Sequence, residues 1–378
     1  MRILHIYKDY FPVLGGIENH VRVLAEAGVQ RGHEVTVLAA SLDRSLQIET
    51  LNGVKLIKTP RWINISSAPM SPAMFRWAQK IGASAGIVHL HFPYPLGELA
   101  HLFSGSPAKT IITYHSDIVR QKFLRMIYRP FLWRILRKAD RIIATSDRYR
   151  DTSPYISRFK EKCVTIPLGS DIDHFANVDP QKVLELRKQL IPDKERTTHS
   201  ILLSVGRLRY YKGLDDLIRA LPAIPDAITV IVGSGPMQAE WRQLVRSGGV
   251  ANRVVFAGEV DDQELPLYYA ASDLFVLPAN ARAEAFGTVI VEAMAAGRAV
   301  ISTEIGTGTS WINVNGQTGL VVPPHAPDQL AAAINSLLND PDRRKKYGQA
   351  AQVRAQADFS VNKMIDRVYD VYQSLIEH

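Results

Sequence analysis

Short apolar runs alternate with helical segments along this chain of 378 residues. The first run, residues 2–7, leads through a glycine turn into a helical segment that ends near Arg31, and residues 34–38 form the next run. Strands buried on both faces of a parallel sheet are continuously apolar, whereas half-exposed strands alternate apolar with polar residues. The order strand, glycine turn, helix, strand therefore predicts the βαβ unit of a parallel sheet.

The pattern runs in two series with a break between them. The first series continues with predicted strands at residues 54–58, 87–90, 110–114, 141–144 and 163–166. Residues 171–198 contain Pro180, Pro192 and a charged helical piece, and we interpret them as a linker. The second series has predicted strands at residues 200–205, 227–232, 253–256, 273–277, 299–302 and 319–322, followed by three helices. We predict an α/β protein whose two Rossmann-like doubly wound domains, residues 1–170 and 199–359, face each other across a cleft.

The composition limits the classes of function. No apolar run approaches the roughly eighteen residues that span a bilayer, and Lys8 and Asp9 interrupt the amino-terminal strand too early for a signal peptide. A single cysteine, Cys163, excludes intrachain disulfides and suits a reducing cytoplasm. Residues 1–170 hold 24 Lys and Arg against 12 Asp and Glu, whereas residues 171–378 hold 21 against 25. The basic first half suits nucleic acid, an anionic membrane surface or an acidic substrate.

The stretch 283–294 places two carboxylates around a helix start. Glu284 is expected in the loop after a strand, and Glu292 about two turns into a helix that begins near Phe286. Free backbone N–H groups and the helix dipole favour an anion such as phosphate at that start. We predict a site for a phosphorylated polyol, and its expected backbone positions are Phe286, Gly287, Thr288 and Val289. The alternative is that both glutamates are solvated charges on a helix face.

Glycine turns follow the first strand of each series. In the turn 206–213, Arg207 leaves the strand end and Lys212 precedes the next helix, so both cations can converge on a diphosphate. The alternative is a solvated basic loop. Gly15 and Gly16 lie in the corresponding turn of the first domain, where backbone can approach a ligand or form an ordinary tight turn.

Two further strand ends of the second domain are assigned to the nucleotide. The loop at Gly233 resembles the start of a dinucleotide fingerprint, but Gln238 stands where the third glycine belongs, so it does not indicate NAD. Backbone groups near Val260 are expected to recognise the base, so the types of the side chains there say little about which base is bound.

Histidines end two strands of the first domain. We interpret His115 as a functional residue that points into the cleft, although a lone histidine is more often structural. His89 and His91 also end a strand, but no third ligand follows at metal-site spacing, so we interpret both as structural. Asp171 and Asp173 resemble a divalent-metal pair but belong to the entrance of the linker. We predict neither a metal site nor a cofactor.

A basic segment lies between Arg120 and Arg150. It contains ten Lys and Arg residues interleaved with apolar ones, and only two acids. Such a segment can lie on an anionic bilayer, or it can be an ordinary helix with its apolar face inward, and both interpretations stay open. Pro130 is expected to split it into two helices.

In their order along nearly the whole chain, these motifs resemble those of the retaining glycosyltransferases of family four. The matching residues are Gly15-Gly16-Ile17-Glu18, Tyr114-His115, Leu168-Gly169-Ser170-Asp171, Gly206-Arg207, Lys212-Gly213 and Glu284-Ala285-Phe286-Gly287 with Glu292. The resemblance implies the two-domain GT-B fold and transfer from a nucleotide-diphosphate sugar without an essential metal. It also implies that the closing helix, residues 360–378, crosses back onto the first domain.

The resemblance assigns roles to the cations. Arg207 and Lys212 hold the diphosphate, and Gly16 approaches it from the first domain. Cleavage of the sugar–phosphate bond puts negative charge on the leaving diphosphate, which these groups and the helix start stabilise. No well-placed carboxylate nucleophile is evident in the first domain. Front-face attack, in which a diphosphate oxygen takes the acceptor's proton, is therefore our mechanistic hypothesis.

The remaining residues contact the sugar and the nucleoside. By the resemblance, Glu284 and the neighbouring backbone meet the donor sugar, Glu292 meets the ribose hydroxyls and His115 faces the transferred sugar. Residues 306–324 are similar to bacterial mannosyl- and rhamnosyltransferases of surface polysaccharide, which favours GDP-mannose over a UDP- or dTDP-sugar. We expect a cytoplasmic enzyme, peripheral at the inner face of the plasma membrane, that adds a hexose to a glycan or lipid-linked acceptor.

Two other classes of protein remain as alternatives. A sugar-nucleotide epimerase or hydrolase on the same scaffold would turn over the donor without an acceptor. A nucleic-acid binder is suggested by the pI of about 9.4, but the acidic second half argues against it, and we predict no nucleic-acid partner.

Overall fold

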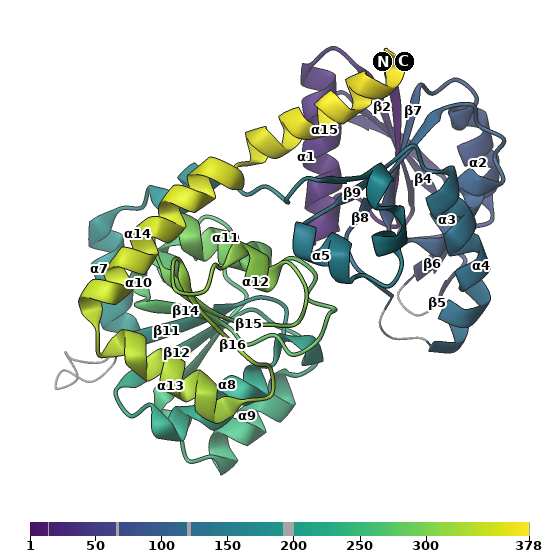
Figure 1. Cartoon of the computed structure of the whole chain (residues 1–378). Coiled ribbons are helices and arrows are strands. Elements are labelled where there is room, and N and C mark those ends of the chain that lie inside the picture. Colours follow the sequence, from purple (N-terminus) through teal and green to yellow (C-terminus); the bar gives the residue numbers. More distant parts are fainter. Residues whose placement is uncertain (14, 66–67, 119–121, 192–199, 378) are drawn as a thin grey trace. The chain divides into compact units, whose positions relative to one another are not determined.

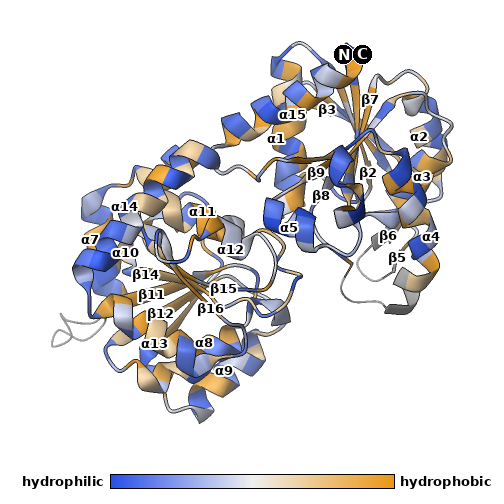
Figure 2. Ribbon diagram, viewed as in Figure 1, coloured by the Kyte–Doolittle hydropathy of each residue, from blue (hydrophilic) through white to orange (hydrophobic). Residues whose placement is uncertain are grey.

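The computed structural model describes residues 1–13, 15–65, 68–118, 122–191 and 200–377 (Figure 1). The chain divides into two compact units, Met1–Leu168 with Met364–His378, and Gly169–Lys363. Each unit is built on one large parallel sheet with helices packed on it, as the alternating pattern predicts. In Figure 2 the strands of both sheets are coloured as hydrophobic, whereas the outer helices carry the hydrophilic colour along one side.

The first unit contains an eight-stranded sheet in the order β10-β9-β8-β7-β1-β2-β4-β3. The bounds are β1 (Arg2–Ile6), β2 (Glu34–Ala40), β3 (Gln47–Leu51), β4 (Val54–Thr59), β7 (Ile87–Phe92), β8 (Lys109–Tyr114), β9 (Arg141–Ala144) and β10 (Cys163–Thr165). Neighbouring strands are parallel except for β3 with β4. A small hairpin of β5 (Ile63–Ile65) and β6 (Ala68–Met70) stands apart from this sheet. The sequence did not predict β3, β5 or β6, because these short strands lack the continuous apolar run of a buried parallel strand.

The second unit contains a six-stranded, entirely parallel sheet in the order β13-β12-β11-β14-β15-β16. The bounds are β11 (Ser200–Val205), β12 (Ala227–Val232), β13 (Val254–Gly258), β14 (Leu274–Leu277), β15 (Ala299–Thr303) and β16 (Gly319–Val322). Every residue of β12, β14 and β15 is buried, which explains why the apolar runs predict these strands well.

Helices cover the sheets. In the first unit they are α1 (Gly16–Gln30), α2 (Ala73–Gly82), α3 (Pro95–Leu102), α4 (Lys122–Lys138) and α5 (Asp147–Thr152). In the second unit they are α6 (Ile172–Ala176), α7 (Pro180–Leu190), α8 (Leu214–Ala220), α9 (Gln238–Ser247), α10 (Leu265–Ala271), α11 (Thr288–Ala295), α12 (Thr309–Ile312), α13 (Pro327–Leu338) and α14 (Pro341–Asp358). The last helix, α15 (Val361–Ile376), belongs to the first unit from Met364 on, where Tyr369 donates a hydrogen bond of 3.0 Å to the Leu24 carbonyl of α1. None of the described helices is long and apolar enough to cross a membrane.

Two segments differ from their predicted form. Residues 171–191, the described part of the predicted linker, form α6 and α7 and belong to the second unit, where Arg187 pairs with Asp273 at 2.7 Å. The prediction that Pro130 splits the basic segment is wrong, because α4 runs through Pro130. The missing N–H and the steric clash at a proline cost about 3 kcal/mol, and the face of α4 that Leu132 and Leu136 bury offsets this cost. Arg120 lies outside the described residues.

Among the parallel strands of each sheet, the strand order reverses at one place. In the first unit β1 lies between β2 and β7, and in the second unit β11 lies between β12 and β14. Loops at the carboxyl ends of strands on the two sides of such a reversal run in opposite directions, which leaves a crevice where open α/β sheets bind ligands. The loops after β1, β7, β11 and β14 are therefore where candidate functional residues are to be sought.

Candidate active site

The second unit brings an ion pair to the reversal of its strand order. Lys212 lies in the loop after β11 and Glu284 in the loop after β14, and these strands are neighbours. The Lys212 Nζ lies 2.7 Å from a Glu284 carboxylate oxygen, and only 10% and 11% of the two side chains are exposed. Removal of either partner of such a shielded ion pair leaves an uncompensated charge, which destabilises the folded protein. The structure therefore brings together two predicted site residues that are far apart in the sequence.

Two glycines allow the Lys212 loop to fold over the end of β11. Gly206 has a φ of 137°, and a Cβ there would lie 2.9 Å from the Lys212 Nζ. Gly213 has a φ of 64°, and a Cβ there would lie 2.0 Å from the carbonyl oxygen of Pro278, which follows β14. Only glycine adopts both conformations without strain and leaves room for these neighbours. The glycines thereby bring the Lys212 ammonium to Glu284.

The charge of Lys212 is secured by its neighbours. Burial by itself would lower the pKa of Lys212, but the Glu284 carboxylate outweighs burial, and the pKa ends above its ordinary value. The Glu292 carboxylate acts in the same direction. Lys212 is therefore a full, fixed positive charge at neutral pH.

Glu292 is held beside this pair by a tyrosine of α10. Its Oε2 accepts a hydrogen bond of 2.6 Å from the Tyr269 hydroxyl. Burial raises the pKa of Glu292, whereas the Tyr269 hydrogen bond and the Lys212 charge lower it. Glu292 is thus a partly buried, anchored acceptor rather than a solvated charge on a helix face. No pattern in the sequence predicted the role of Tyr269, because a tyrosine in an apolar helix is interpreted first as a core residue.

The start of α11 differs from the prediction. Gly287, with φ 89° and ψ 58°, ends the preceding loop, and α11 begins at Thr288 rather than near Phe286. Glu292 therefore stands one turn, not two, into the helix. Because glycine has no side chain to cap the helix, the first-turn N–H groups, including those of Thr288 and Val289, keep their capacity for an anion.

A second glycine-containing loop, residues 304–309, fixes the backbone around Glu284. The Thr307 hydroxyl donates a hydrogen bond of 2.8 Å to the Glu284 carbonyl, and the Gly308 N–H donates one of 2.8 Å to the Ala285 carbonyl. A Cβ on Gly308 would lie 2.9 Å from the Phe286 Cα. Gly308 is thus needed for this close approach, and the only signal in the sequence was the run of glycine and threonine.

The other predicted donor-side residues lie at neighbouring strand ends. Gly233 has a φ of 119°, a Cβ there would lie 2.3 Å from the Gly206 carbonyl oxygen, and its N–H donates a hydrogen bond of 2.6 Å to the Gly258 carbonyl. The loops after β11, β12 and β13 are therefore packed backbone against backbone. Val260, two residues beyond β13, is half-buried, and Arg207 is exposed.

The glycine turn of the first unit is open on one side. Gly15 and Gly16 are exposed, and a Cβ on Gly16 would meet nothing within 4 Å. A Cβ on Gly15, by contrast, would lie 2.3 Å from the Glu18 Oε2. The Glu18 carboxylate therefore folds back over Gly15 at the start of α1, where the helix dipole favours it.

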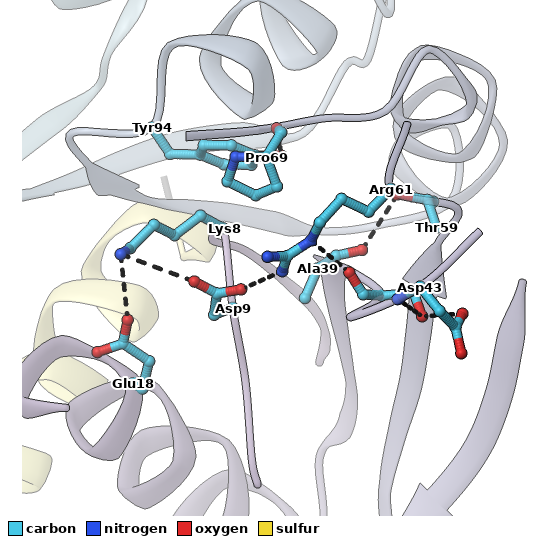
Figure 3. A network of polar contacts seen from close by, with 10 residues as sticks. Lys8, Asp9, Glu18, Ala39, Asp43, Thr59, Arg61, Pro69 and Tyr94 are labelled. Carbon is cyan, nitrogen blue, oxygen red and sulfur yellow. Dashed lines mark hydrogen bonds and ion pairs between the residues drawn. The ribbon is translucent and has the colours of Figure 1, made fainter. Parts of the chain in front are cut away.

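Glu18 belongs to a row of alternating charges (Figure 3). Lys8, in the loop after β1, lies 3.5 Å from Glu18 and 3.7 Å from Asp9. Arg61 in turn pairs with Asp9 at 2.5 Å. Two cations and two carboxylates thus balance one another next to the glycine turn, and only Glu18 among them belongs to a motif that the sequence predicts.

His115 is packed inside the first unit rather than open at a strand end. It is 4% exposed, its Nε2 lies 3.3 Å from the His91 Nδ1, and the His91 Nε2 lies 3.1 Å from the His5 Nδ1. Burial, with the nearby His20, holds the pKa of His115 well below its usual range. His115 is therefore a neutral imidazole, and its assignment to the transferred sugar stays a prediction.

Histidines from several elements meet around His91. Two groups of three could hold a metal ion, and they are His5 with His89 and His91, and His20 with His91 and His115. The prediction that His89 and His91 are structural rests on the lack of a third ligand at metal-site spacing along the sequence, whereas in space further imidazoles lie close to both residues. Spacing along the sequence could not show it, because His5 lies on β1 and His20 on α1.

The two doubly wound sheets, with polar residues gathered where their strand orders reverse, define the GT-B class of glycosyltransferases. Residues 187–354 match the model of the family described as Glycosyl transferases group 1, and residues 14–174 match that of Glycosyltransferase Family 4. The chain is 34% identical to the O-antigen chain mannosyltransferase C of Escherichia coli, over 100% of this chain and 99% of that protein. It is 36% identical to the D-rhamnosyltransferase WbpZ of Pseudomonas aeruginosa, over 95% and 92% of the two chains.

Among solved structures, the sucrose-phosphate synthase of Thermosynechococcus elongatus superimposes with a TM-score of 0.80 at 25% identity, covering 100% of this chain and 99% of that one. The predicted GT-B fold is thereby confirmed. The chain belongs to glycosyltransferase family 4, and it is a glycosyltransferase.

Proposed function

We propose that this enzyme transfers a hexose, with mannose preferred, from a nucleotide-diphosphate sugar to a glycan or lipid-linked acceptor during synthesis of a cell-surface polysaccharide. The observation that carries the proposal is the shielded Lys212–Glu284 pair at the end of β11. The names of the two relatives support a mannosyl or rhamnosyl group, and GDP-mannose is the donor we favour.

The donor would be held chiefly by the second unit. A diphosphate brings its own negative charge to Lys212, so the ammonium can exchange the Glu284 carboxylate for phosphate oxygens. Arg207 and the free N–H groups at the start of α11 would add further donors. Glu284 is then released to accept hydrogen bonds from the sugar hydroxyls, and Glu292 to accept them from the ribose. Until the donor binds, the Glu284 carboxylate thus neutralises the positive charge of Lys212.

We further propose that transfer retains the anomeric configuration and needs no divalent cation. The bond between the anomeric carbon and the diphosphate oxygen breaks, the acceptor oxygen bonds to that carbon on the same face, and the leaving diphosphate takes the acceptor's proton. Lys212, Arg207 and the helix start supply the positive charge that a metal ion would otherwise provide. Addition of Mg²⁺ is therefore expected to leave the rate unchanged.

The experiment compares donors by melting temperature and by product. Among GDP-mannose, a UDP-sugar and a dTDP-sugar at equal concentration, GDP-mannose is expected to raise the melting temperature most, because a ligand that binds more tightly stabilises the folded state more. NMR of the product should show the donor's anomeric configuration. Rapid turnover of the donor without acceptor would instead favour an epimerase or hydrolase, and inversion or a trapped glycosyl-enzyme would refute front-face attack.

Helix α4 is the proposed contact with an anionic membrane. Met126 and Ile127 are 65% and 55% exposed on a helix that also carries Arg129 and Arg134. Apolar side chains flanked by cations suit an interface of anionic lipid. The chain is expected to sediment with vesicles of phosphatidylglycerol but not of phosphatidylcholine, and Met126→Ser with Ile127→Ser should weaken this binding. If the unsubstituted chain and the double variant sediment equally with both kinds of vesicle, α4 is an ordinary surface helix.

A further inference from the structure

The first unit gathers imidazoles from a helix and two strand ends in one buried place. His20 lies one turn into α1, His91 lies on β7, and His115 follows β8. One ring nitrogen from each lies within 4.8 Å of the others. All three residues are buried, with 7%, 1% and 4% of their surfaces exposed. Buried polar groups need partners, so such a cluster requires an explanation.

Hydrogen bonds explain part of the cluster and set His89 apart. The His89 Nδ1 lies 2.5 Å from the Tyr372 hydroxyl, and its Nε2 lies 2.7 Å from the Thr113 hydroxyl. Both nitrogens of His89 are therefore engaged, which excludes the group of three that contains it. By contrast, three ring nitrogens of the neighbouring histidines are buried and have no hydrogen-bond partner among the described residues: the Nε2 of His20, the Nε2 of His5 and the Nδ1 of His115.

We propose that His20, His91 and His115 bind one divalent transition-metal ion, Zn²⁺ in the first place, which ties the start of α1 to the ends of β7 and β8. Two nitrogens bound to one tetrahedral ion at about 2.0–2.1 Å stand about 3.3 Å apart. The His91 Nδ1 and the His115 Nε2 are 3.3 Å apart. The plane of the His20 ring is inclined by 76° to that of His91 and by 82° to that of His115, with centroid distances of 5.6 Å and 5.0 Å.

A hydrogen bond between His91 and His115 is the competing explanation for the 3.3 Å separation. It leaves the His20 Nε2 buried without a partner, which destabilises the folded chain. An ion bound by all three rings accounts for this nitrogen as well as for the separation. It also fixes the tautomer of His91: with Nδ1 on the ion, its Nε2–H donates to the His5 Nδ1, 3.1 Å away. Metal-bound histidines ordinarily donate their second N–H to such an outer partner.

Three imidazole ligands suit Zn²⁺, Cu²⁺, Ni²⁺ and Co²⁺, and the fourth tetrahedral position is left for a water molecule. The three histidines belong to the first unit, whereas Lys212, Arg207 and Glu284 belong to the second. The metal proposal therefore uses none of the residues that would hold the diphosphate, and metal binding can be measured independently of donor binding and of transfer.

The test uses the untagged full chain, stripped with a chelator and then titrated with Co²⁺ and with Zn²⁺. Four-coordinate Co²⁺ absorbs visible light much more strongly than six-coordinate Co²⁺, so one equivalent should produce an intense spectrum that Zn²⁺ abolishes. After dialysis, metal analysis should find roughly one Zn²⁺ per chain, and Zn²⁺ should raise the melting temperature. Weak six-coordinate absorption, or less than about a tenth of an equivalent after dialysis, overturns the proposal.

Variants locate the ion. His20→Gln is expected to lose the bound metal and the cobalt spectrum, whereas His101→Gln should keep both. His101 is the matched control, since it is a buried histidine of the same unit whose Nε2 bonds to the Thr110 hydroxyl at 2.9 Å. Retention of metal by His20→Gln, or equal loss in both folded variants, contradicts the site. If His20→Gln does not fold, the spectrum and stoichiometry of the unsubstituted chain decide.

Discussion

The two units place polar residues at the same topological position, but these residues form an ion pair in the second unit and are uncharged in the first. At the reversal of the second sheet, Lys212 and Glu284 are both charged and compensate each other across 2.7 Å. At the reversal of the first sheet, His5, His91 and His115 are neutral imidazoles whose pKa values burial lowers. A fixed positive charge can hold an anion such as the proposed diphosphate, whereas a neutral imidazole keeps the lone pair that the proposed metal ion needs. The same scaffold thus carries two different electrostatic environments.

The largest expected effect is at Lys212. Lys212→Ala should lower kcat about a hundred- to a thousandfold, because one preorganised charge on a leaving group contributes about 3–4 kcal/mol to the barrier. It should also lower the free energy of unfolding, since Glu284 is left shielded and unpaired. Transfer assays and urea denaturation measure the two effects.

Two further variants test whether the effects of Lys212→Ala come from the loss of its charge. Lys346→Ala, at an exposed lysine of α14, should change neither quantity. Adding Glu284→Gln to Lys212→Ala should restore stability but not transfer. A double variant as unstable as Lys212→Ala would show that the loss comes from packing and not from the unmatched charge.

A smaller effect is expected at Arg207, which is exposed. Arg207→Ala should lower kcat/KM about ten- to a hundredfold, because a charge-assisted contact is lost. Unlike Lys212→Ala, it should leave the urea midpoint unchanged. Arg246→Ala on α9 is the matched exposed control. Full transfer activity of Arg207→Ala would show that Arg207 belongs to a solvated basic loop and does not contact the diphosphate.

Glu292 is expected to act on donor binding alone. Glu292→Gln should raise the donor KM about tenfold at little cost in kcat, since at a half-buried site a hydrogen bond to a charged group contributes about 1.5 kcal/mol, the lower end of its usual range. Tyr269→Phe removes only the 2.6 Å hydrogen bond that orients Glu292 and should have a smaller effect in the same direction. An unchanged donor KM in both variants would show that Glu292 does not bind the ribose hydroxyls.

The smallest effects concern the pH dependence of stability in the first unit, where two groups of α3 act with opposite signs. Burial raises the pKa of Glu98 to about 8, so its contribution to stability is full below 4.5 and is lost as the pH rises through 8. Burial, then Lys138, lowers the pKa of His101 to about 3, so its contribution is full above 6.5 and is lost as the pH falls.

Urea denaturation between pH 4 and pH 8 tests both signs. Relative to the unsubstituted chain, Glu98→Gln should gain stability as the pH rises, and His101→Gln should gain it as the pH falls, by up to about 1.4 kcal/mol per pH unit. Parallel stability curves for the three proteins would contradict the view that the first unit buries these groups in their neutral forms.

Local sequence was sufficient where burial is nearly complete. The strands β9, β11 and β12 were predicted with the bounds that the structure has, because a strand buried on both faces is an almost unbroken apolar run. The edge strand β3 was missed because its residues are largely exposed and its pairing with β4 is antiparallel. Helix α4 was wrongly divided at Pro130, since the rule for proline takes no account of the face that the helix buries.

The sequence by itself determined the α/β class, the two series of strands, the glycines at the turns and the residue types that can bind a diphosphate. Only the tertiary structure decided which of these residues meet. Lys212 contacts Glu284, and His20 joins His91 and His115, because strand order is not the order along the chain and reverses beside β1 and β11. Contacts across that reversal depend on the packing of whole sheets, which no local pattern of residues encodes.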